Sequence, residues 1–335
     1  MPLAGEDRVK LQSLQEWISL DLELFEREYA RLLSGELPLL VEISEHLRRG
    51  VGKRFRPTLL LISSKSAEEP NAEAVFAAAC VELVHTATLI HDDFIDEAST
   101  RRGLPTVNAR WGASAALIMG DFLYSKVFAL LTARQRHEEL AILARTTHQM
   151  SIAEMMQLER RRRLSQTEDE YLGIIRRKTA SLIEASCEMG ALVNPELVEH
   201  RGRLASFGLN VGLAFQITDD IFDYEGDLRR LGKPVGGDWR EGRITLPFIA
   251  AWKNAGGEAR QRILDCVAAE NNGGNGADHW PLVCEFVQEH GGLEFAHTRA
   301  HHYGQAAKDA LGGLPARPQR EILAAAADYV LARLY

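Results

Sequence analysis

Apolar residues recur at intervals of three and four along most of this chain, which is the spacing of one face of an α-helix. In residues 8–33, for example, Leu11, Leu14, Ile18 and Phe25 fall on one stripe. The same spacing predicts further helices over 38–50, 72–96, 113–133, 137–160, 167–190, 199–223, 245–254, 258–269, 280–290, 293–310 and 318–334. No stretch shows the alternation of a β-strand, and no short-period repeat is present. The pattern therefore predicts an all-α fold, with residues 1–335 forming a single-domain helical bundle.

Composition narrows the class of protein. The chain has 335 residues, of which 46% are hydrophobic and 26% charged, as in ordinary soluble globular proteins. A net charge of −8 argues against a general nucleic-acid binder. We see no apolar run of transmembrane length, and the first ten residues lack a signal-peptide core. The four cysteines are scattered in apolar surroundings without a CxxC pair, which predicts buried, reduced thiols and a cytoplasmic location. They are Cys80, Cys187, Cys266 and Cys284.

The segment 81–106, VELVHTATLIHDDFIDEASTRRGLPT, predicts a buried helix that ends in acidic residues. Asp92 and Asp96 are four residues apart and so lie on one helix face, one turn from each other. Two adjacent carboxylates repel each other unless a cation lies between them. Carboxylate oxygens in this arrangement suit Mg²⁺, which proteins often hold with one or two carboxylates plus substrate phosphates. Arg101 and Arg102 follow within reach of such phosphates.

A second copy of the pattern makes two unrelated solvated helix ends a poor explanation. Residues 215–223 read FQITDDIFD and again end an apolar run, with Asp219, Asp220 and Asp223 at the same relative positions. Two facing acidic clusters can hold several Mg²⁺ ions around one diphosphate.

Three basic segments accompany the acidic motifs. Residues 48–57, RRGVGKRFRP, combine five cations, two glycines and a following helix N-terminus, which fits either an anion site or a solvated loop. Residues 226–244, rich in glycine and cations, indicate a mobile lid over phosphates. The run Arg160–Arg163 is predicted to be a solvated face or loop, with contact to a membrane surface as a weaker alternative. The segment 271–278, NNGGNGAD, is predicted to be a flexible surface loop.

With both acidic motifs in place, the chain resembles the trans-type polyprenyl diphosphate synthases over roughly residues 10–335. The motifs that carry the resemblance are GKRFRP, LIHDDFIDEASTRRG, RRKTASLI, FQITDDIFD and LGKPVGGDWREGRITLP, in that order. The resemblance implies an isoprenoid synthase-like bundle around a deep central apolar cavity, usually a homodimer, with about three Mg²⁺ ions per site. Two departures are Val51, where relatives have glycine, and Arg243, where many have lysine.

The resemblance also implies a role for each matching residue. The diphosphate of isopentenyl diphosphate would be bound by Lys53, Arg56, His85 and Arg102. The allylic diphosphate would be contacted by Arg101, Lys178, Thr179, Gln216 and Lys233. The metal ligands would be Asp92, Asp96, Asp219 and Asp223. The catalytic set would be Asp92, Asp96, Arg101, Lys178 and Asp219. His85 could instead be a core histidine, Thr179 a helix hydroxyl bonded to its own backbone, and Gln216 a packing residue.

The expected chemistry begins with loss of diphosphate from the allylic substrate, assisted by the metal and the cations. The double bond of isopentenyl diphosphate then attacks the carbocation, and the released pyrophosphate is the expected base. The small residues Ala87 and Thr88, before Asp92, resemble those of long-chain enzymes, although Ala87 could simply pack between helices. We expect a product of about thirty to fifty carbons, with octaprenyl diphosphate as the single guess.

Other functions compete with this one. A short-chain synthase making farnesyl or geranylgeranyl diphosphate would keep the same motifs. A class I terpene cyclase would not need the second basic set, and a partner subunit of a heteromeric synthase would tend to lose an acidic motif. The expected partners are therefore the two diphosphate substrates and a second copy of the chain, with at most peripheral membrane contact during product release.

Overall fold

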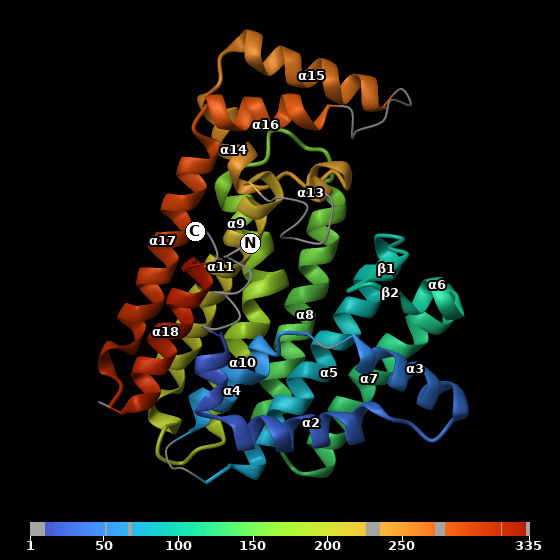
Figure 1. The fold of residues 1–335 in the computed structure, drawn as a ribbon, viewed down its shortest axis with the longest axis vertical. Helices are drawn as coiled ribbons and strands as arrows, with labels where there is room; N and C mark the ends of the chain where they lie inside the picture. Colours follow the sequence, from blue (N-terminus) through green and yellow to red (C-terminus); the bar gives the residue numbers. More distant parts are fainter. Residues whose placement is uncertain are drawn as a thin grey trace.

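The computed structural model is built almost entirely of α-helices (Figure 1), which confirms the predicted all-α class. It describes residues 11–50, 52–65, 69–225, 235–271, 279–315 and 317–332. The helices are α2 Ser19–Leu33, α3 Pro38–Arg49, α4 Phe55–Ser64, α5 Ala72–Ile95, α6 Val107–Trp111, α7 Ala113–Ala133, α8 His137–Glu159, α9 Glu168–Ile175, α10 Ser181–Leu192, α11 Arg201–Glu225, α13 Gly237–Arg240, α14 Leu246–Asn254, α15 Gly257–Asn271, α16 Trp280–Glu289, α17 Gly292–Ala310 and α18 Pro318–Ala332. A π-helical segment, η1, spans Arg176–Ala180, and 3-10 turns lie at η2 Val198–His200 and η3 Leu311–Gly313.

Helix α5 lies inside the bundle and carries the first acidic motif at its carboxyl end (Figure 1). Asn71 begins the helix, because its side chain accepts hydrogen bonds from the backbone N–H groups of Glu73 and Ala74 at 3.0 and 3.3 Å. Apolar residues then surround almost the whole helix, so it can be buried against α2, α4, α7 and α10. The acidic end of α5 is thereby brought to the centre of the molecule.

Helices α10 and α11 approach each other closely through two glycines. A side chain on Gly208 would lie 2.6 Å from the carbonyl oxygen of Ile183, and one on Gly212 would lie 2.5 Å from the Cα of Ala180. Because neither glycine has a side chain, α11 packs directly on α10 and η1. This packing sets the second acidic motif of α11 beside the RRKTA segment.

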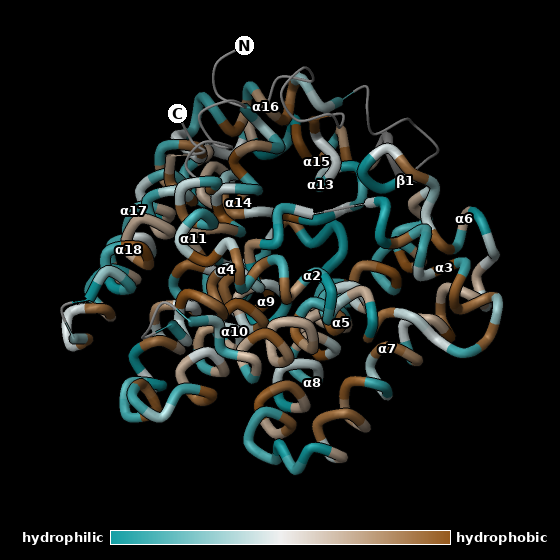
Figure 2. The backbone as a smooth tube through the Cα atoms, turned by 60° about the horizontal axis from the view of Figure 1, so that its bottom comes forward, coloured by the Kyte–Doolittle hydropathy of each residue, from teal (hydrophilic) through white to brown (hydrophobic). Residues whose placement is uncertain are grey.

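Two groups of buried side chains form the core. One lies among α2, α4, α5, α7 and α10, and the other among α9, α14, α16, α17 and the second half of α11. Figure 2 shows hydrophobic stretches along α4, α5 and α10, and most of the apolar residues of these helices are buried. Helix α11 contacts members of both groups and so joins them.

The structure corrects several predicted boundaries. The helix predicted over 8–33 is interrupted by a turn at Trp17 and Ile18, and α6 and α13 were not predicted. A two-stranded antiparallel pair, β1 Thr100–Arg101 with β2 Leu104–Pro105, was not predicted either. The two-residue turn between the strands has positive φ at both Arg102 and Gly103. Each strand has only two residues, which is too short for an alternation of apolar and polar residues to show in the sequence.

The helix predicted over 167–190 is divided by the π segment η1. The Arg177 side chain donates a hydrogen bond to the carbonyl oxygen of Gly173 at 2.8 Å, and the following backbone bonds shift to the wider π spacing. The backbone N–H of Ser181, for example, bonds to the carbonyl of Arg176. The π segment changes the direction of the side chains that follow it, including Lys178 and Thr179.

Within the described residues, two helices are long and apolar enough to cross a membrane, whereas the sequence predicted no such segment. These are α5 and α7, judged by length and composition alone. In the relevant window α5 is 78% buried inside the protein, so it is a core helix of the bundle. Helix α7 is only 33% buried and leaves apolar side chains such as Ile118 on the surface. All four cysteines are free. Three are buried as predicted, whereas Cys284 is only half-buried.

Candidate functional site

The first acidic motif directs its three aspartates to different surroundings. Asp93 is buried and accepts two hydrogen bonds of 2.8 Å from the Nε of Arg101. Asp92 is half-buried in the last turn of α5, and Asp96 follows at the helix end, where it is exposed. Burial raises the pKa of Asp92 to about 6, although the charge of Lys178 opposes this. A cation beside Asp92 would therefore stabilise its ionised form.

The second acidic motif is divided in the same way. Asp220 is buried and accepts hydrogen bonds from the Tyr171 hydroxyl at 2.6 Å and the Gln216 amide at 2.8 Å. Burial raises the pKa of Asp220 well above its ordinary value. Asp219 is half-buried, and its negative charge counteracts the fall in the pKa of Arg56 that burial causes.

Asp223 holds the short helix α13 in place. Its carboxylate accepts the backbone N–H groups of Gly237 at 3.1 Å and Asp238 at 3.0 Å. Burial and the nearby charge of Asp238 raise the pKa of Asp223. Each carboxylate oxygen thus already accepts one hydrogen bond, which leaves other lone pairs for the metal role predicted from sequence.

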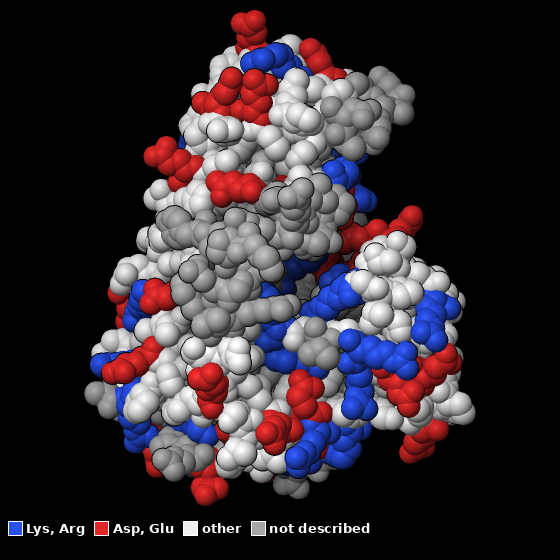
Figure 3. Space-filling model, viewed as in Figure 1, with Lys and Arg blue, Asp and Glu red and all other residues white. Residues whose placement is uncertain are grey.

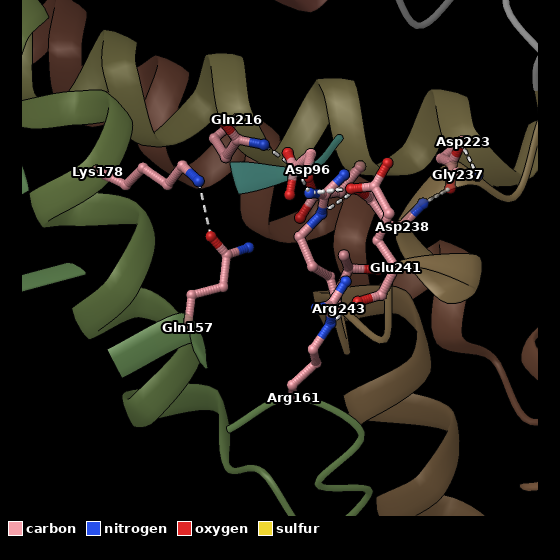
Figure 4. Close-up of polar contacts among 12 residues, drawn as sticks. Asp96, Gln157, Arg161, Lys178, Gln216, Asp223, Gly237, Asp238, Glu241 and Arg243 are labelled. Carbon is pink, nitrogen blue, oxygen red and sulfur yellow. Dashed lines mark hydrogen bonds and ion pairs between the residues drawn. The ribbon is translucent and has the colours of Figure 1, made fainter. Parts of the chain in front are cut away.

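Arg243 links the two acidic motifs (Figure 4). Its Nε donates to Asp238 at 2.8 Å, and its guanidinium also pairs with Glu241 and lies 3.5 Å from Asp96. Since Asp223 binds the first turn of α13, a continuous series of contacts runs from the second motif to the first. Burial alone would lower the pKa of Arg243, but the negative charges of Asp238 and Glu241 outweigh it and raise the pKa.

Lys178 and Thr179 extend from the π segment towards the acidic motifs. The ammonium of Lys178 contacts Glu154 at 2.6 Å and Gln157 at 2.7 Å, both on α8 (Figure 4). The Thr179 hydroxyl donates to the Gln216 amide oxygen at 2.7 Å, and the amide nitrogen of Gln216 donates to Asp220. Gln216 and Thr179 therefore belong to one polar network, rather than acting as a packing residue and a helix-bonded hydroxyl.

A second basic group forms where the loop before α4 meets the β1–β2 turn. Arg102 donates to the carbonyl oxygen of Gly50 at 2.7 Å, and its guanidinium lies against Gly52, where a Cβ would be only 2.6 Å away. The Arg56 guanidinium lies 3.1 Å from the Nε2 of His85. Burial and several arginines lower the pKa of His85 well below its ordinary value, so a neutral ring accepts this hydrogen bond.

Lys53 completes this group and touches the last described helix, with its ammonium 3.4 Å from the Tyr329 hydroxyl of α18. Figure 3 shows Lys and Arg side chains gathered around a hollow in the middle of one face, with acidic side chains at its upper edge. Among the described basic residues named from sequence, one group thus gathers near Gly50, Lys178 lies against α8, and Arg101 pairs with Asp93.

Several residues of this region escaped the sequence analysis. Arg54 has a left-handed backbone (φ 54°), forms ion pairs with Glu26 at 2.7 Å and Glu82 at 2.8 Å, and stacks on Tyr29. It therefore anchors the loop between Lys53 and Arg56. Glu154, Gln157 and Tyr171 were missed as well, because nothing in their local sequence marks them as partners of Lys178 or Asp220.

The residues predicted to set chain length lie on α5 below Asp92. Ala87 is fully buried, and Thr88 is half-buried with its hydroxyl donating to the carbonyl oxygen of His85 at 2.7 Å. A pocket of about 210 Å³ between α8 and α10 is lined by polar side chains such as Arg145 and Glu184, so it does not suit a prenyl tail. The deep apolar cavity stays a prediction.

Lys233, Val51 and the loop segment 226–234 lie outside the described residues. Within the described part of the chain, no three carboxylate, histidine or cysteine groups come together as a ready-made metal site. Mg²⁺ is commonly held by one or two carboxylates and completed by substrate phosphates. The hard oxygen donors Asp92, Asp96 and Asp219 fit that ion.

Comparison with known proteins gives a consistent result. The family model "Polyprenyl synthetase" matches residues 37–278. The chain is 38% identical to an all-trans-nonaprenyl-diphosphate synthase (geranyl-diphosphate specific) of Rhodobacter capsulatus, covering 87% of this chain and 88% of that protein. It is 36% identical to a short chain isoprenyl diphosphate synthase of Methanothermobacter thermautotrophicus, covering 88% and 90%. A polyprenyl synthase of Caulobacter crescentus, solved with calcium and isoprenyl diphosphate, superposes with a TM-score of 0.88 at 33% identity, covering 97% and 98%.

Proposed function

The chain belongs to the polyprenyl synthetase family of prenyl-transferring enzymes, and from this premise we propose that it condenses isopentenyl diphosphate with an allylic diphosphate. The observation that carries the proposal is the presence of two separate basic sets around two linked acidic motifs. Arg56, His85 and Arg102 form one set, and Lys178 with Thr179 lies in the other. A cyclase ionises a single diphosphate and has no use for two such sets.

We assign Asp92, Asp96 and Asp219 as the main Mg²⁺ ligands, with Asp223 as a further ligand, and propose about three ions per site. Bound Mg²⁺ would supply positive charge for the departing diphosphate. The relative from Caulobacter crescentus, solved with calcium and isoprenyl diphosphate, supports a divalent cation here. Asp93 has a different task, since it accepts both hydrogen bonds from Arg101 and so fixes the direction of that cation.

The chain's own cations would then act on the two substrates. Lys178 and Arg101 would bind the allylic diphosphate and stabilise the charge that develops as it leaves. Lys53, Arg56 and Arg102 would hold isopentenyl diphosphate, and the neutral ring of His85 would fix the direction of the Arg56 guanidinium. We propose that the released diphosphate, kept in place by the same cations, accepts the proton lost after condensation.

For the product, we propose a long chain of about thirty to fifty carbons, with octaprenyl diphosphate as the best single candidate. The relatives described above range from short-chain to nonaprenyl synthases, so they give the reaction and not its length. The support for a long product is the small, fully buried Ala87 below the first acidic motif. A short-chain product is the alternative that product analysis would show.

We also propose that the protein works as a homodimer in the cytoplasm, with all of residues 1–335 in one domain. The support for a dimer is the apolar surface of the adjacent helices α7 and α8, where Ile118 is 63% exposed and Met155 is 67% exposed. A second copy of the chain would remove these side chains from water. Light scattering on the purified protein would give twice the mass of the chain, and a monomeric mass would contradict the proposal.

The reaction itself is tested with purified protein, Mg²⁺, radiolabelled isopentenyl diphosphate and each allylic primer in turn, with products identified by mass spectrometry. We expect incorporation of label into a prenyl diphosphate. Arg56→Gln should raise the KM for isopentenyl diphosphate, and Lys178→Met should raise the KM for the allylic primer. Release of unlabelled hydrocarbon would instead indicate a cyclase, and turnover only after a second protein is added would indicate a partner subunit.

A further inference from the structure

The run Arg160–Arg163 follows α8 directly and is a largely exposed turn, as predicted, but its residues also make specific contacts that the sequence did not show. The Nε of Arg161 donates a hydrogen bond to the backbone carbonyl of Glu241 at 2.6 Å, and the backbone N–H of Arg162 donates to the carbonyl of Gly242 at 2.8 Å. Arg160 and Arg163 point elsewhere, to Glu170 at 3.3 and 3.8 Å. Two members of the run thus hold the turn that follows α13 (Figure 4).

The contact is too close for either partner to move independently. Gly242 has a left-handed backbone (φ 74°), and a Cβ at this position would lie 2.8 Å from the Cγ of Arg162 and 2.9 Å from the Cγ of Arg161. Arg162 itself also has a positive φ of 60°. Backbone strain of this kind persists where surrounding contacts fix it, so the turn and the run form one unit.

The turn carries Arg243, the residue that joins the two acidic motifs. Its guanidinium reaches Asp96 at 3.5 Å from a position one residue beyond Gly242. Asp238, at the start of the turn, accepts a hydrogen bond from the Arg243 side chain and so fixes the other end. A shift of the turn would therefore move the guanidinium relative to Asp96.

The same part of α8 also sets the position of Lys178. Glu154 and Gln157, on the last two turns of the helix, contact the Lys178 ammonium at 2.6 and 2.7 Å. Figure 4 shows Lys178 hydrogen-bonded to Gln157 of α8, and Arg243 lying near Arg161, which follows the same helix. The carboxyl end of α8 thus fixes the spacing between two cations that flank the first acidic motif.

From these contacts we infer that Arg161 is a positioning residue, which acts through the Glu241–Gly242 turn to hold Arg243 at the diphosphate site. This role rests on the proposed function, because it concerns the site of the allylic diphosphate. Arg161 does not itself need to touch the substrate. Its side chain is exposed, so its replacement should leave the fold intact.

The test variant is Arg161→Met, which removes the Nε donor and keeps an unbranched apolar stem. Arg163→Met is the matched control, since it removes the same charge two residues away from a side chain that pairs with Glu170 and not, among the described residues, with the turn. We expect Arg161→Met to lower kcat/KM for the allylic primer about tenfold and to leave the KM for isopentenyl diphosphate unchanged. Arg163→Met should change neither. Equal effects of the two variants would show that the run acts only through long-range attraction of its positive charge for the diphosphate, and this would overturn the inference.

A double-mutant cycle tests whether Arg161 acts through Arg243. In an Arg243→Met background, Arg161→Met should have little further effect, because the group that it positions is already gone. Independent, multiplying effects of the two substitutions would overturn the inference.

Binding of inorganic pyrophosphate with Mg²⁺, measured by calorimetry, separates this inference from the proposed function because it needs no turnover. Arg161→Met should weaken this binding about tenfold, and Arg163→Met should not. If the wild-type chain bound pyrophosphate in this way but transferred no prenyl group, the proposed function would fail while the positioning role stood. Unchanged pyrophosphate binding by Arg161→Met would overturn the positioning role.

Discussion

Replacing Tyr171 by phenylalanine tests whether the buried network behind the second acidic motif supports the site. Tyr171 and Asp220 are each 2% exposed, and the hydroxyl and carboxylate oxygens are 2.6 Å apart. Asp220 in turn accepts from Gln216 at 2.8 Å, and Gln216 accepts from Thr179 at 2.7 Å. The substitution removes only the hydroxyl at the start of this series.

The size of the effect follows from burial. A buried polar group left without its hydrogen-bond partner costs roughly 1–3 kcal/mol, and Tyr171→Phe would leave an oxygen of Asp220 in that state. We expect Tyr171→Phe to lower the free energy of unfolding by about 2 kcal/mol, measured by urea denaturation. In a thermal melt the midpoint should fall by several degrees.

Tyr171→Phe should also weaken binding of the allylic substrate. Without its tyrosine partner, Asp220 is free to rotate and take the Gln216 amide with it, so the KM for the allylic primer should rise while that for isopentenyl diphosphate stays constant. Tyr303→Phe is the control, because Tyr303 is half-buried on α17 and its hydroxyl has no hydrogen-bond partner among the described residues. If Tyr171→Phe were as stable as Tyr303→Phe and kept the wild-type KM values, the reasoning from this network would be refuted.

Three further predictions follow from single contacts. Ala87→Phe should shorten the product to about fifteen to twenty carbons by filling the path of the tail, and an unchanged product on chromatography would remove Ala87 from that path. His85 has a lowered pKa, so below pH 6.5 the unfolded chain binds a proton that the folded protein excludes, and stability falls as the pH falls. His85→Gln should therefore lose less stability than the wild type between pH 6.5 and 5, by up to about 1.4 kcal/mol per pH unit, and parallel stability curves would contradict this. Gly120→Ala places a Cβ 2.1 Å from the Nε2 of His91, so it should lower the unfolding free energy by about 1–3 kcal/mol, and wild-type stability in urea would show that His91 can move aside.

The long helices could be predicted from sequence because their apolar spacing is local information. The bounds of α5, α7 and α8 agree with the predicted ranges 72–96, 113–133 and 137–160 to within a residue. The π segment could not be predicted in this way. It depends on a hydrogen bond between the Arg177 side chain and the Gly173 carbonyl, and on a second bond of 3.0 Å from Arg177 to Gln149 of α8. The bond to Gly173 is local, but only the folded chain brings Gln149 to Arg177.

The candidate site shows the same division between local and long-range information. The sequence named the aspartates and most of the cations, since their spacing in the chain already points to phosphate and metal chemistry. It did not show which cations anchor the backbone. Arg54 stands between two residues assigned to substrate, yet its partners Glu26 and Glu82 lie on α2 and α5. The contact of the exposed Arg161 could not be predicted for the same reason, because its partner Glu241 is 80 residues away in the sequence.

The two acidic motifs also explain why each contains adjacent aspartates. Neighbouring residues on a helix point about 100° apart, so when the first faces the site the second must turn into the protein. Asp93 and Asp220, the second members, are 6% and 2% exposed, and each meets a dedicated donor, Arg101 in one case and Tyr171 in the other. A buried carboxylate without such a donor would be too costly to keep. The second aspartate thereby ties the first, which we propose as a metal ligand, to a side chain from another element. The geometry of each motif therefore depends on tertiary contacts that the repeated sequence pattern does not display.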